Sequence, residues 1–265
     1  MKHYLTDTHA HIYAEEFDKD REDVVANAFR QGVKKILLPN IDSSTITAML
    51  NLSQQYPDNI YPMMGLHPTS VKEDFENELQ IVRKYLQEEK FYAIGEIGID
   101  LYWDQTFVAE QKIAFETQID LAIEHKLPIV IHARESFNEI FEIMDKKWSR
   151  DLKGVFHSFT GNQEQADKII NDYQFYIGIN GILTFKNSNL SEVVKNIDLQ
   201  HILLETDAPY LAPVPKRGKR NESSFVYHTA LKMAEIHQIP LDELARITTE
   251  NAENLFHFPI KLTEK

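Results

Sequence analysis

Two histidines, His9 and His11, stand two positions apart near the beginning of the chain, in the segment TDTHAH. In an extended strand the side chains of residues i and i+2 point to the same side, so both imidazoles can reach a single point. That geometry suits a metal site. It suits equally well two ordinary polar residues on a solvated strand face, so the choice between these interpretations depends on the rest of the chain.

The chain has no cysteine and eleven histidines among its 265 residues. The lack of cysteine excludes disulfides, thiolate nucleophiles and cysteine-based zinc sites, so a transition-metal site must be built from imidazoles and carboxylates. With 43% hydrophobic residues, the chain can bury a sizeable core. No apolar stretch approaches the roughly 18 residues of a membrane span, and the opening MKHYLTDTHA lacks the layout of a secretory signal. We therefore expect a cytoplasmic protein with no membrane partner.

Short apolar runs alternate along the chain with longer amphipathic stretches, which is the pattern of repeated strand and helix units. The strand candidates are residues 3–9, 34–39, 60–67, 91–98, 127–133, 153–159, 175–180 and 201–207. Their C-terminal ends are between 23 residues (His157 to Asn180) and 36 residues (Glu96 to His132) apart. This is close to the roughly 31 residues per unit expected for eight units in about 250 residues. We therefore predict an α/β protein with one (β/α)8 TIM barrel, a single domain over residues 1–265, and not an open doubly wound sheet.

Helices are predicted between the strands and after the last one. Apolar residues recur at helical spacing over 137–144, behind Ser136, where a capping-box pattern occurs. Residues 225–238 and 241–256 are predicted to form two final helices. Residues 208–224, with three prolines and a basic cluster, are predicted to form a long loop after the eighth strand.

Histidines and acids stand at six of the eight predicted strand ends. In a (β/α)8 barrel those ends meet on one rim, where catalytic groups gather. If these were unrelated polar residues, their occurrence at six strand ends would be a coincidence. We therefore interpret the set as a metal centre at the C-terminal ends of the strands. Its members are His9, His11, His67, Glu96, His132, His157, Glu205 and Asp207.

The number of donor groups allows two metal ions. Imidazole and carboxylate together suit Zn, Mn, Fe or Ni, whereas a site dominated by oxygen favours Mg or Ca. One ion would be held by His9, His11 and Asp207, and the other by His132 and His157. Glu96 would bridge them, since a shared carboxylate holds two cations about 3.5–4 Å apart; its alternative role is a rim carboxylate at a strand end loosened by glycines. The expected cofactors are two divalent ions, with Zn, Mn, Mg and Ni as candidates.

Seven short motifs follow one another along the chain: DTHAH, MGLHP, GEIGID, IHAR, HSFTG, ETDAP and RGKRNE. In order and spacing they resemble the TatD family of metal-dependent deoxyribonucleases, which are amidohydrolase-like TIM barrels, from Asp7 to about Phe256. Family members often have cysteine where this chain has Ala10 and Ser158, and proline where it has Ser223, which leaves the basic loop less stiff. The resemblance implies a (β/α)8 fold and metal-supported hydrolysis of DNA phosphodiesters. It also implies metal-ligand roles for His9, His11, Glu96, His132, His157 and Asp207.

Hydrolysis of a phosphodiester needs an activated water and neutralisation of growing negative charge. We assign Asp207 as a ligand that also takes the proton of the water, in the general-base role. Glu205, two residues earlier on the same predicted strand, would point the same way and either touch a metal or orient water. His67 would donate to the phosphate or protonate the leaving oxygen, unless it is only a rim histidine before a proline turn. Arg134 would bind phosphate oxygens, or pair with Glu135.

The segment PVPKRGKRNE carries four basic residues within five positions, on a chain whose formal net charge is −13. So negative a chain is not expected to coat nucleic acid by bulk attraction. Because the loop leaves the strand that carries Asp207, we assign Lys219 and Arg220 to substrate phosphates and not to a merely solvated loop. Screening limits each charge to about 8 Å, so the predicted partner is DNA at strand ends or in short single-stranded segments. Aromatic residues beyond strand ends would stack on bases or pack in the core: Tyr102, Trp103, Phe185 and Tyr210.

Two other function classes stay open. A metal-dependent amidohydrolase, lactonase, esterase or deacylase, acting on a small or tRNA-linked substrate, would use the same ions but not the basic loop. Charge reversal of Lys219 and Arg220 would separate that class from a nuclease. A binding protein would keep the metals without turnover, and would have no use for His67, Glu205 and Arg134. No unpaired apolar helix face is obvious, so we expect a monomer with no obligate protein partner.

Overall fold

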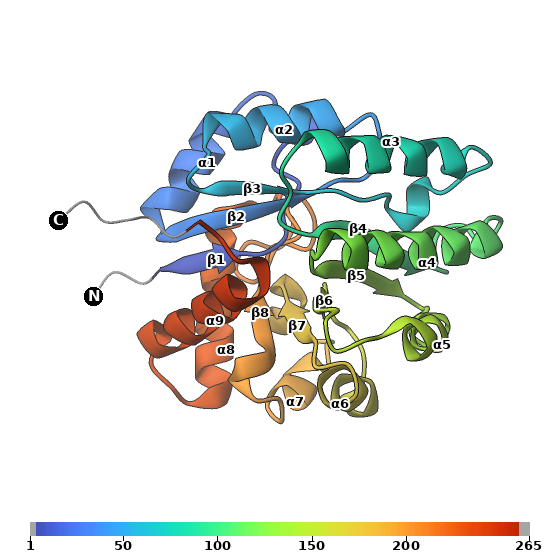
Figure 1. Ribbon diagram of the computed structural model, residues 1–265. Helices are drawn as coiled ribbons and strands as arrows, with labels where there is room; N and C mark the ends of the chain where they lie inside the picture. The colour runs from blue at the N-terminus through green and yellow to red at the C-terminus, as the bar shows by residue number, and fades with distance from the viewer. Residues whose placement is uncertain (1–3, 260–265) are drawn as a thin grey trace.

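Eight parallel strands form the inner wall of the molecule in the computed structural model, which describes residues 4–259 (Figure 1). The strands are β1 (Leu5–Asp7), β2 (Val33–Pro39), β3 (Ile60–Met63), β4 (Ile94–Asp100), β5 (Ile129–Arg134), β6 (Gly154–Phe156), β7 (Tyr176–Ile179) and β8 (Ile202–Leu204). Each of the eight predicted runs overlaps one observed strand. His3, the first residue of the run predicted over 3–9, lies outside the described residues, as do the two ends of the predicted domain.

The barrel closes through two isolated bridges. β1, β2 and β3 pair in order, and β4 to β8 pair in order, all in parallel. Met64 bridges to Ile94 and Ala10 bridges to Ala208, so the β3 segment meets β4 and the β8 segment meets β1. The predicted (β/α)8 TIM barrel is confirmed. Because all strands run the same way, their C-terminal ends share one rim.

Strand side chains alternate between the barrel interior and the helix layer. Leu37 of β2, Val130 of β5 and Leu203 of β8 belong to a small inner cluster. The residues on either side of each belong to the larger cluster beneath the helices. Ala93, just before β4, and Phe256 join the inner cluster, so Phe256 closes the N-terminal end of the barrel. The opposite end is left for the functional groups.

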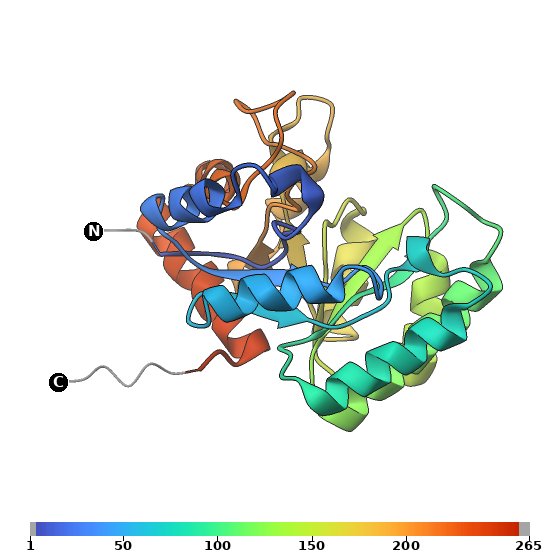
Figure 2. The same ribbon diagram turned by 90° about the horizontal axis from the view of Figure 1, so that it is seen from above.

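The helices surround the strands on the outside (Figure 2). They are α1 (Arg21–Arg30), α2 (Ile46–Gln55), α3 (Phe75–Glu88), α4 (Val108–His125), α5 (Phe137–Lys147), α6 (Gln163–Asn171), α7 (Leu190–Val194), α8 (Val226–His237) and α9 (Leu241–Phe256). In α3, for example, Phe75, Leu79, Val82 and Leu86 recur on one face and are buried. The two final helices are confirmed as α8 and α9. Within residues 4–259, no helix is long and apolar enough to cross a membrane.

Two local predictions differ from the structure. Ser136 stands at the start of α5, but its hydroxyl donates to the carbonyl of Ile99 at 2.5 Å and makes no capping bond. β1 ends at Asp7, β3 at Met63, β6 at Phe156 and β8 at Leu204, so the chain leaves these four strands before their functional side chains. Asp207 has a φ of +59°, in the left-handed region that a strand does not contain. Strand alternation therefore does not set the directions of the side chains beyond β8.

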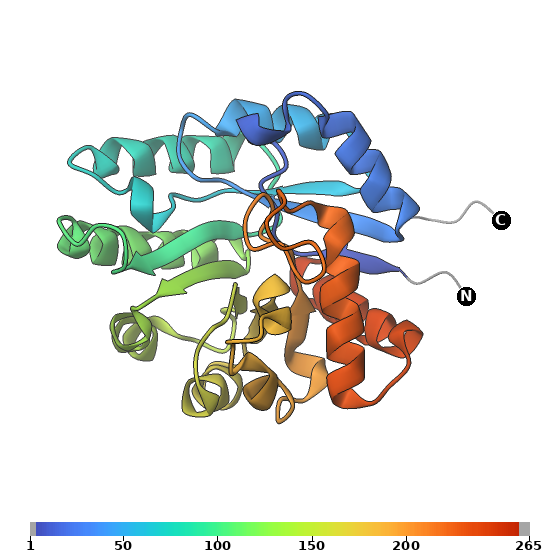
Figure 3. The ribbon, with the colours of Figure 1, turned by 180° about the vertical axis from the view of Figure 1, so that it is seen from behind.

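The long loop after β8 ends in a 3₁₀ turn, η5 (Ser223–Phe225). Figure 3 shows this loop, in orange, beside the dark blue segment that follows β1. Arg220 joins the two segments through a bidentate ion pair with Asp20 and a hydrogen bond to the carbonyl of Glu16. In Figure 2 the loop projects from the barrel together with the segment after β7, where the guanidinium of Arg217 lies 4.0 Å from the ring centroid of Phe185.

Candidate metal centre

Four donor groups, one on β4 and three on the segments that follow β1 and β8, meet at one point of the rim. His9 Nε2 lies 3.3 Å from His11 Nε2 and 3.1 Å from Glu96 Oε2, which is 3.8 Å from His11 Nε2. Asp207 Oδ1 lies 3.9 Å from His9 Nε2 and 3.7 Å from His11 Nε2. Ligands about 2.1 Å from a tetrahedral ion are about 3.4 Å apart, so these separations fit one divalent cation.

The other oxygen of Glu96 contacts a different set of imidazoles. Oε1 lies 2.7 Å from His132 Nδ1, 3.1 Å from His157 Nε2 and 3.4 Å from His67 Nε2. Glu96 is 2% exposed, and it joins two of the three clusters of donor atoms that could hold a metal ion within residues 4–259. The four predicted histidine ligands thus converge on one carboxylate, although His9 and His132 are separated by more than a hundred residues in the chain.

In three of the histidines, a hydrogen bond at one ring nitrogen fixes the direction in which the other ring nitrogen points. Tyr13 donates its hydroxyl hydrogen to the carbonyl of Pro39, so its oxygen accepts from His11 Nδ1 at 2.9 Å. The Nε2–H of His132 donates to Asp100 at 2.8 Å, and the Nδ1–H of His157 donates to Glu205 at 3.1 Å. When the ring is neutral, the remaining nitrogen turns its lone pair toward Glu96. Burial opposes protonation of His132 and His157, but the neighbouring acids outweigh it and raise the pKa of both, so a proton can take the place of a metal cation there. Lone pairs facing a carboxylate repel it unless a cation lies between them, so the donor set fits metal ions.

His67 has the opposite arrangement. The backbone N–H of Thr69 donates to His67 Nδ1 at 3.1 Å, so this nitrogen accepts and the proton of the neutral ring lies on Nε2. His67 Nε2 therefore presents a hydrogen, and not a lone pair, to the cavity. The hydrogen-bond pattern separates His67 from the histidines that are suited to hold a cation.

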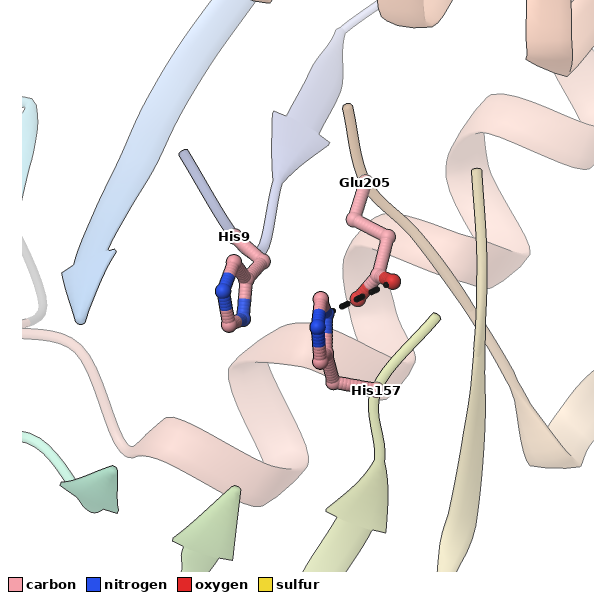
Figure 4. Close-up of side chains that lie close together, drawn as sticks. All are labelled: His9, His157 and Glu205. Carbon is pink, nitrogen blue, oxygen red and sulfur yellow. Dashed lines mark hydrogen bonds and ion pairs between the residues drawn. The ribbon is translucent and has the colours of Figure 1, made fainter. Parts of the chain in front are cut away.

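Glu205 lies behind the metal cluster and does not line the cavity. Its Oε1 accepts from His157 Nδ1 and from the backbone N–H of Ser158, at 3.1 and 2.5 Å. The ring of His157 stacks on the ring of His9, with centroids 3.6 Å apart (Figure 4). Glu205 and Asp207 were expected to point the same way along one strand, but β8 ends at Leu204 and their carboxylates meet different partners. Glu205 thus orients His157.

Burial and neighbouring charges shift the pKa values of the two acids at the centre in opposite directions. Burial opposes the ionisation of Glu96, but the imidazoles of His157, His67 and His9 outweigh it and hold its pKa well below the usual range. Burial raises the pKa of Asp207 to about 7, although the imidazole of His157 opposes this. Glu96 is therefore a carboxylate near neutral pH, whereas burial favours the protonated form of Asp207 unless a nearby cation offsets it.

Three supporting residues were missed by the sequence analysis. Asp100 and Tyr13 orient His132 and His11, as described above. The carboxylate of Asp7 accepts from the backbone N–H and the hydroxyl of Thr206, at 2.8 and 2.7 Å, and so ties the end of β1 to the end of β8. Asp7 and Asp100 are the outer residues of DTHAH and GEIGID, which was the only signal available for them in the sequence.

All the predicted metal ligands except the fully buried His9 line a cavity of about 680 Å³, within the range of roughly 300–1,000 Å³ that is usual for ligand sites. Among the predicted substrate residues, Arg134, Tyr102, Trp103 and Tyr210 line it, together with His67 and Asp207. Lys219 and Arg220 do not line the cavity. The guanidinium of Arg220 is engaged by Asp20 and lies 4.3 Å from the ring centroid of Phe17, so it anchors the loop.

Comparison with known proteins gives consistent results. The family model "TatD related DNase" matches residues 6–257. The chain is 40% identical over 253 residues to the uncharacterized metal-dependent hydrolase YabD of Bacillus subtilis, across 95% of this chain and 98% of YabD. It is 33% identical over 260 residues to the uncharacterized metal-dependent hydrolase YcfH of Escherichia coli, across 96% of both chains. The crystal structure of YjjV, a TatD homolog from E. coli, matches with a TM-score of 0.91 and 27% identity, across 98% of this chain and 100% of YjjV.

Proposed function

Because the chain belongs to the TatD-related DNase family of metal-dependent hydrolases, we propose that it is a deoxyribonuclease that cleaves phosphodiester bonds at strand ends or in short single-stranded segments. The observation that carries this proposal is the position of Glu96, whose two carboxylate oxygens face two separate groups of donor atoms. Two ions bound in such a way can clamp the attacking and the leaving oxygen of a phosphodiester.

The residues divide between two divalent ions as the donor distances suggest. His9, His11 and Asp207 would hold one ion, His132 and His157 the other, and Glu96 would be shared. Bound divalent ions would activate water and neutralise phosphate charge, whether they are Zn, Mn, Mg or Ni.

The remaining chemistry belongs to side chains of the cavity. Asp207 lines the cavity beside the other donor groups, and we assign it to accept the proton of the attacking water. His67 presents Nε2–H toward the site and donates it to the phosphate or to the departing oxygen. Arg134 lines the cavity and offers a planar fork to phosphate oxygens. Lys219 lies outside the cavity, on the loop that Arg220 anchors. We assign it to a phosphate of the DNA farther from the cleaved bond.

The proposal is tested with protein purified without chelators. We expect about two ions per chain, and release of nucleotides from end-labelled single-stranded DNA that stops when the ions are removed and resumes when they are returned. Internal cutting of intact duplex as rapid as cutting at ends would contradict the preference for ends. Turnover of carboxylic esters or lactones, with every DNA substrate left intact, would show a small-substrate hydrolase instead.

A further inference from the structure

Two adjacent aromatic rings stand exposed at the mouth of the cavity, on the loop between β4 and α4. Tyr102 is 50% exposed and Trp103 is 68% exposed, and both line the cavity that contains Glu96. Their ring centroids are 4.9 Å apart and the ring planes are nearly perpendicular. Exposed tyrosine and tryptophan rings grouped beside a cavity are typical of binding surfaces, since they offer large apolar faces at a small loss of side-chain entropy.

Arg134 packs against the same two rings. Its guanidinium carbon lies 4.1 Å from the ring centroid of Tyr102 and 5.5 Å from that of Trp103. Within residues 4–259 the guanidinium makes no ion pair, and the pairing with Glu135 considered from the sequence does not form. Stacking holds the face of the guanidinium and leaves the N–H donors in its plane available for an anion.

A single carboxylate joins this loop to the metal centre. Asp100 Oδ1 accepts the backbone N–H groups of Tyr102 and Trp103, both at 3.0 Å. Asp100 Oδ2 accepts from His132 Nε2 at 2.8 Å. The backbone N–H of the residue between β4 and Tyr102 donates to the carbonyl of Arg134 at 3.0 Å. The aromatic rings and the guanidinium are thus held at fixed positions relative to the reacting centre.

We propose that Tyr102, Trp103 and Arg134 form a nucleotide-binding platform for single-stranded nucleic acid. The two rings stack on an unpaired base, and Arg134 binds the phosphate that adjoins it. This inference rests on the proposed nuclease function and extends it, because it states how the substrate is recognised. Stacking uses the face common to all bases, so the platform selects unpaired strands without selecting sequence.

The test uses Trp103 as its own reporter. The chain has two tryptophans, and Trp148→Phe leaves Trp103 as the only one. The metal-loaded protein is titrated with short phosphorothioate oligonucleotides, which resist hydrolysis, and with matched oligonucleotides that lack one base. We expect quenching of Trp103 and about five- to tenfold tighter binding of the oligonucleotide with all its bases, the lower end of the range for one stacked base. Equal affinity for the two oligonucleotides, or no binding of either, would overturn the platform.

Substitutions separate stacking from simple support of Arg134. Trp103→Ala should weaken binding of the complete oligonucleotide about five- to tenfold and leave binding of the abasic one unchanged, whereas Trp103→Phe should restore most of the loss. An equal loss for both oligonucleotides would show that the ring merely supports Arg134. Tyr4→Ala is the matched control, since Tyr4 is 55% exposed with Lys34 Nζ 5.6 Å from its ring centroid, at the far end of the barrel.

Failure of the platform and failure of the proposed function give different results. Binding is measured without turnover, so base-dependent quenching together with intact DNA in the cleavage assay would refute the nuclease and keep the platform. Cleavage of DNA whose rate and KM do not change when Trp103 is replaced by alanine would refute the platform and keep the nuclease. If both hold, Trp103→Ala raises KM for short single strands more than it lowers kcat.

Discussion

The roles of His11, His67, His132 and His157 follow from the partner of the ring nitrogen that points away from Glu96. His11, His132 and His157 each donate a hydrogen away from Glu96 and so turn a lone pair toward it. His67 accepts at Nδ1 and turns a hydrogen toward Glu96 Oε1. Imidazoles that all lie within 3.8 Å of one carboxylate are therefore suited to two different chemical roles.

His67→Asn should lower kcat without removing metal. A general acid contributes about 10²- to 10⁴-fold to the rate, whereas the cations have other ligands. Elemental analysis of the purified variant should find as many ions per chain as in the unaltered protein. His132→Asn is the matched comparison and should lose about one ion. Loss of an ion from the His67 variant would show that His67 is a ligand.

Asp100→Asn should weaken metal binding about 10- to 100-fold, the usual effect of altering the partner of a ligating histidine. The amide keeps an acceptor for His132 Nε2–H but loses the charge that makes the ring a better donor to a cation. Competition against a chelator of known affinity measures the change. Asp104→Asn, an exposed acid of the same loop that pairs with Lys72, should leave the affinity unaltered. An equal affinity in both variants would contradict the role of Asp100.

The convergence of the donor groups could be predicted from the sequence because their types and their places near strand ends are both visible there. Asp100 and Tyr13 could not, because each acts through one hydrogen bond to a ligand from another segment. The pairing of Arg220 with Asp20 was hidden for the same reason, since 200 residues separate them along the chain. The types of the side chains were enough to predict where the donor groups gather. The hydrogen bonds between distant segments could be identified only from the three-dimensional structure.

At the scale of elements, periodicity predicted that strands exist but not where they end. β8 stops at Leu204 because the chain turns through a left-handed residue at Asp207 to bridge Ala208 to Ala10. No apolar pattern records that turn. The three residues after β8 were therefore predicted as strand, and the directions of Glu205 and Asp207 were predicted to be the same.

The closure of the barrel by α9 gives a prediction at this scale. Phe256 is 2% exposed at the N-terminal end of the barrel interior, so Phe256→Ala should lower the free energy of unfolding by about 3–5 kcal/mol. Its distance from the rim should leave kcat per folded molecule unchanged. Denaturant unfolding measures the change in stability, and a turnover assay together with metal analysis of the folded protein measures the second part. Leu231→Ala, on the exposed side of α8, should change stability by less than about 0.5 kcal/mol. Loss of metal from folded Phe256→Ala would contradict the separation of the two ends.

For the whole molecule, the bound ions should contribute to stability as well as to chemistry. The centre joins segments from β1, β4, β5, β6 and β8, and an ion that binds only the folded chain stabilises it by mass action. At 100 times its Kd, one ion adds about 2.7 kcal/mol. Chelation should therefore lower the melting temperature, and added metal should restore it. A melting temperature that is unaffected by chelation would mean that the donors already form an equally stable centre without cations.

The charge of the whole molecule sets how much nucleic acid it can hold. A net charge of −13 repels a polyanion everywhere except near bound cations and a few basic groups such as Arg134 and Lys219. Contacts with one or two phosphates of a single strand would give a plot of log K against log salt with a slope between about −0.7 and −1.4. Lys219→Glu should make this slope shallower by about 0.7 if Lys219 contacts a phosphate. A slope steeper than about −4, which corresponds to some six phosphates, would mean that the protein follows a long stretch of DNA and does not act on its ends.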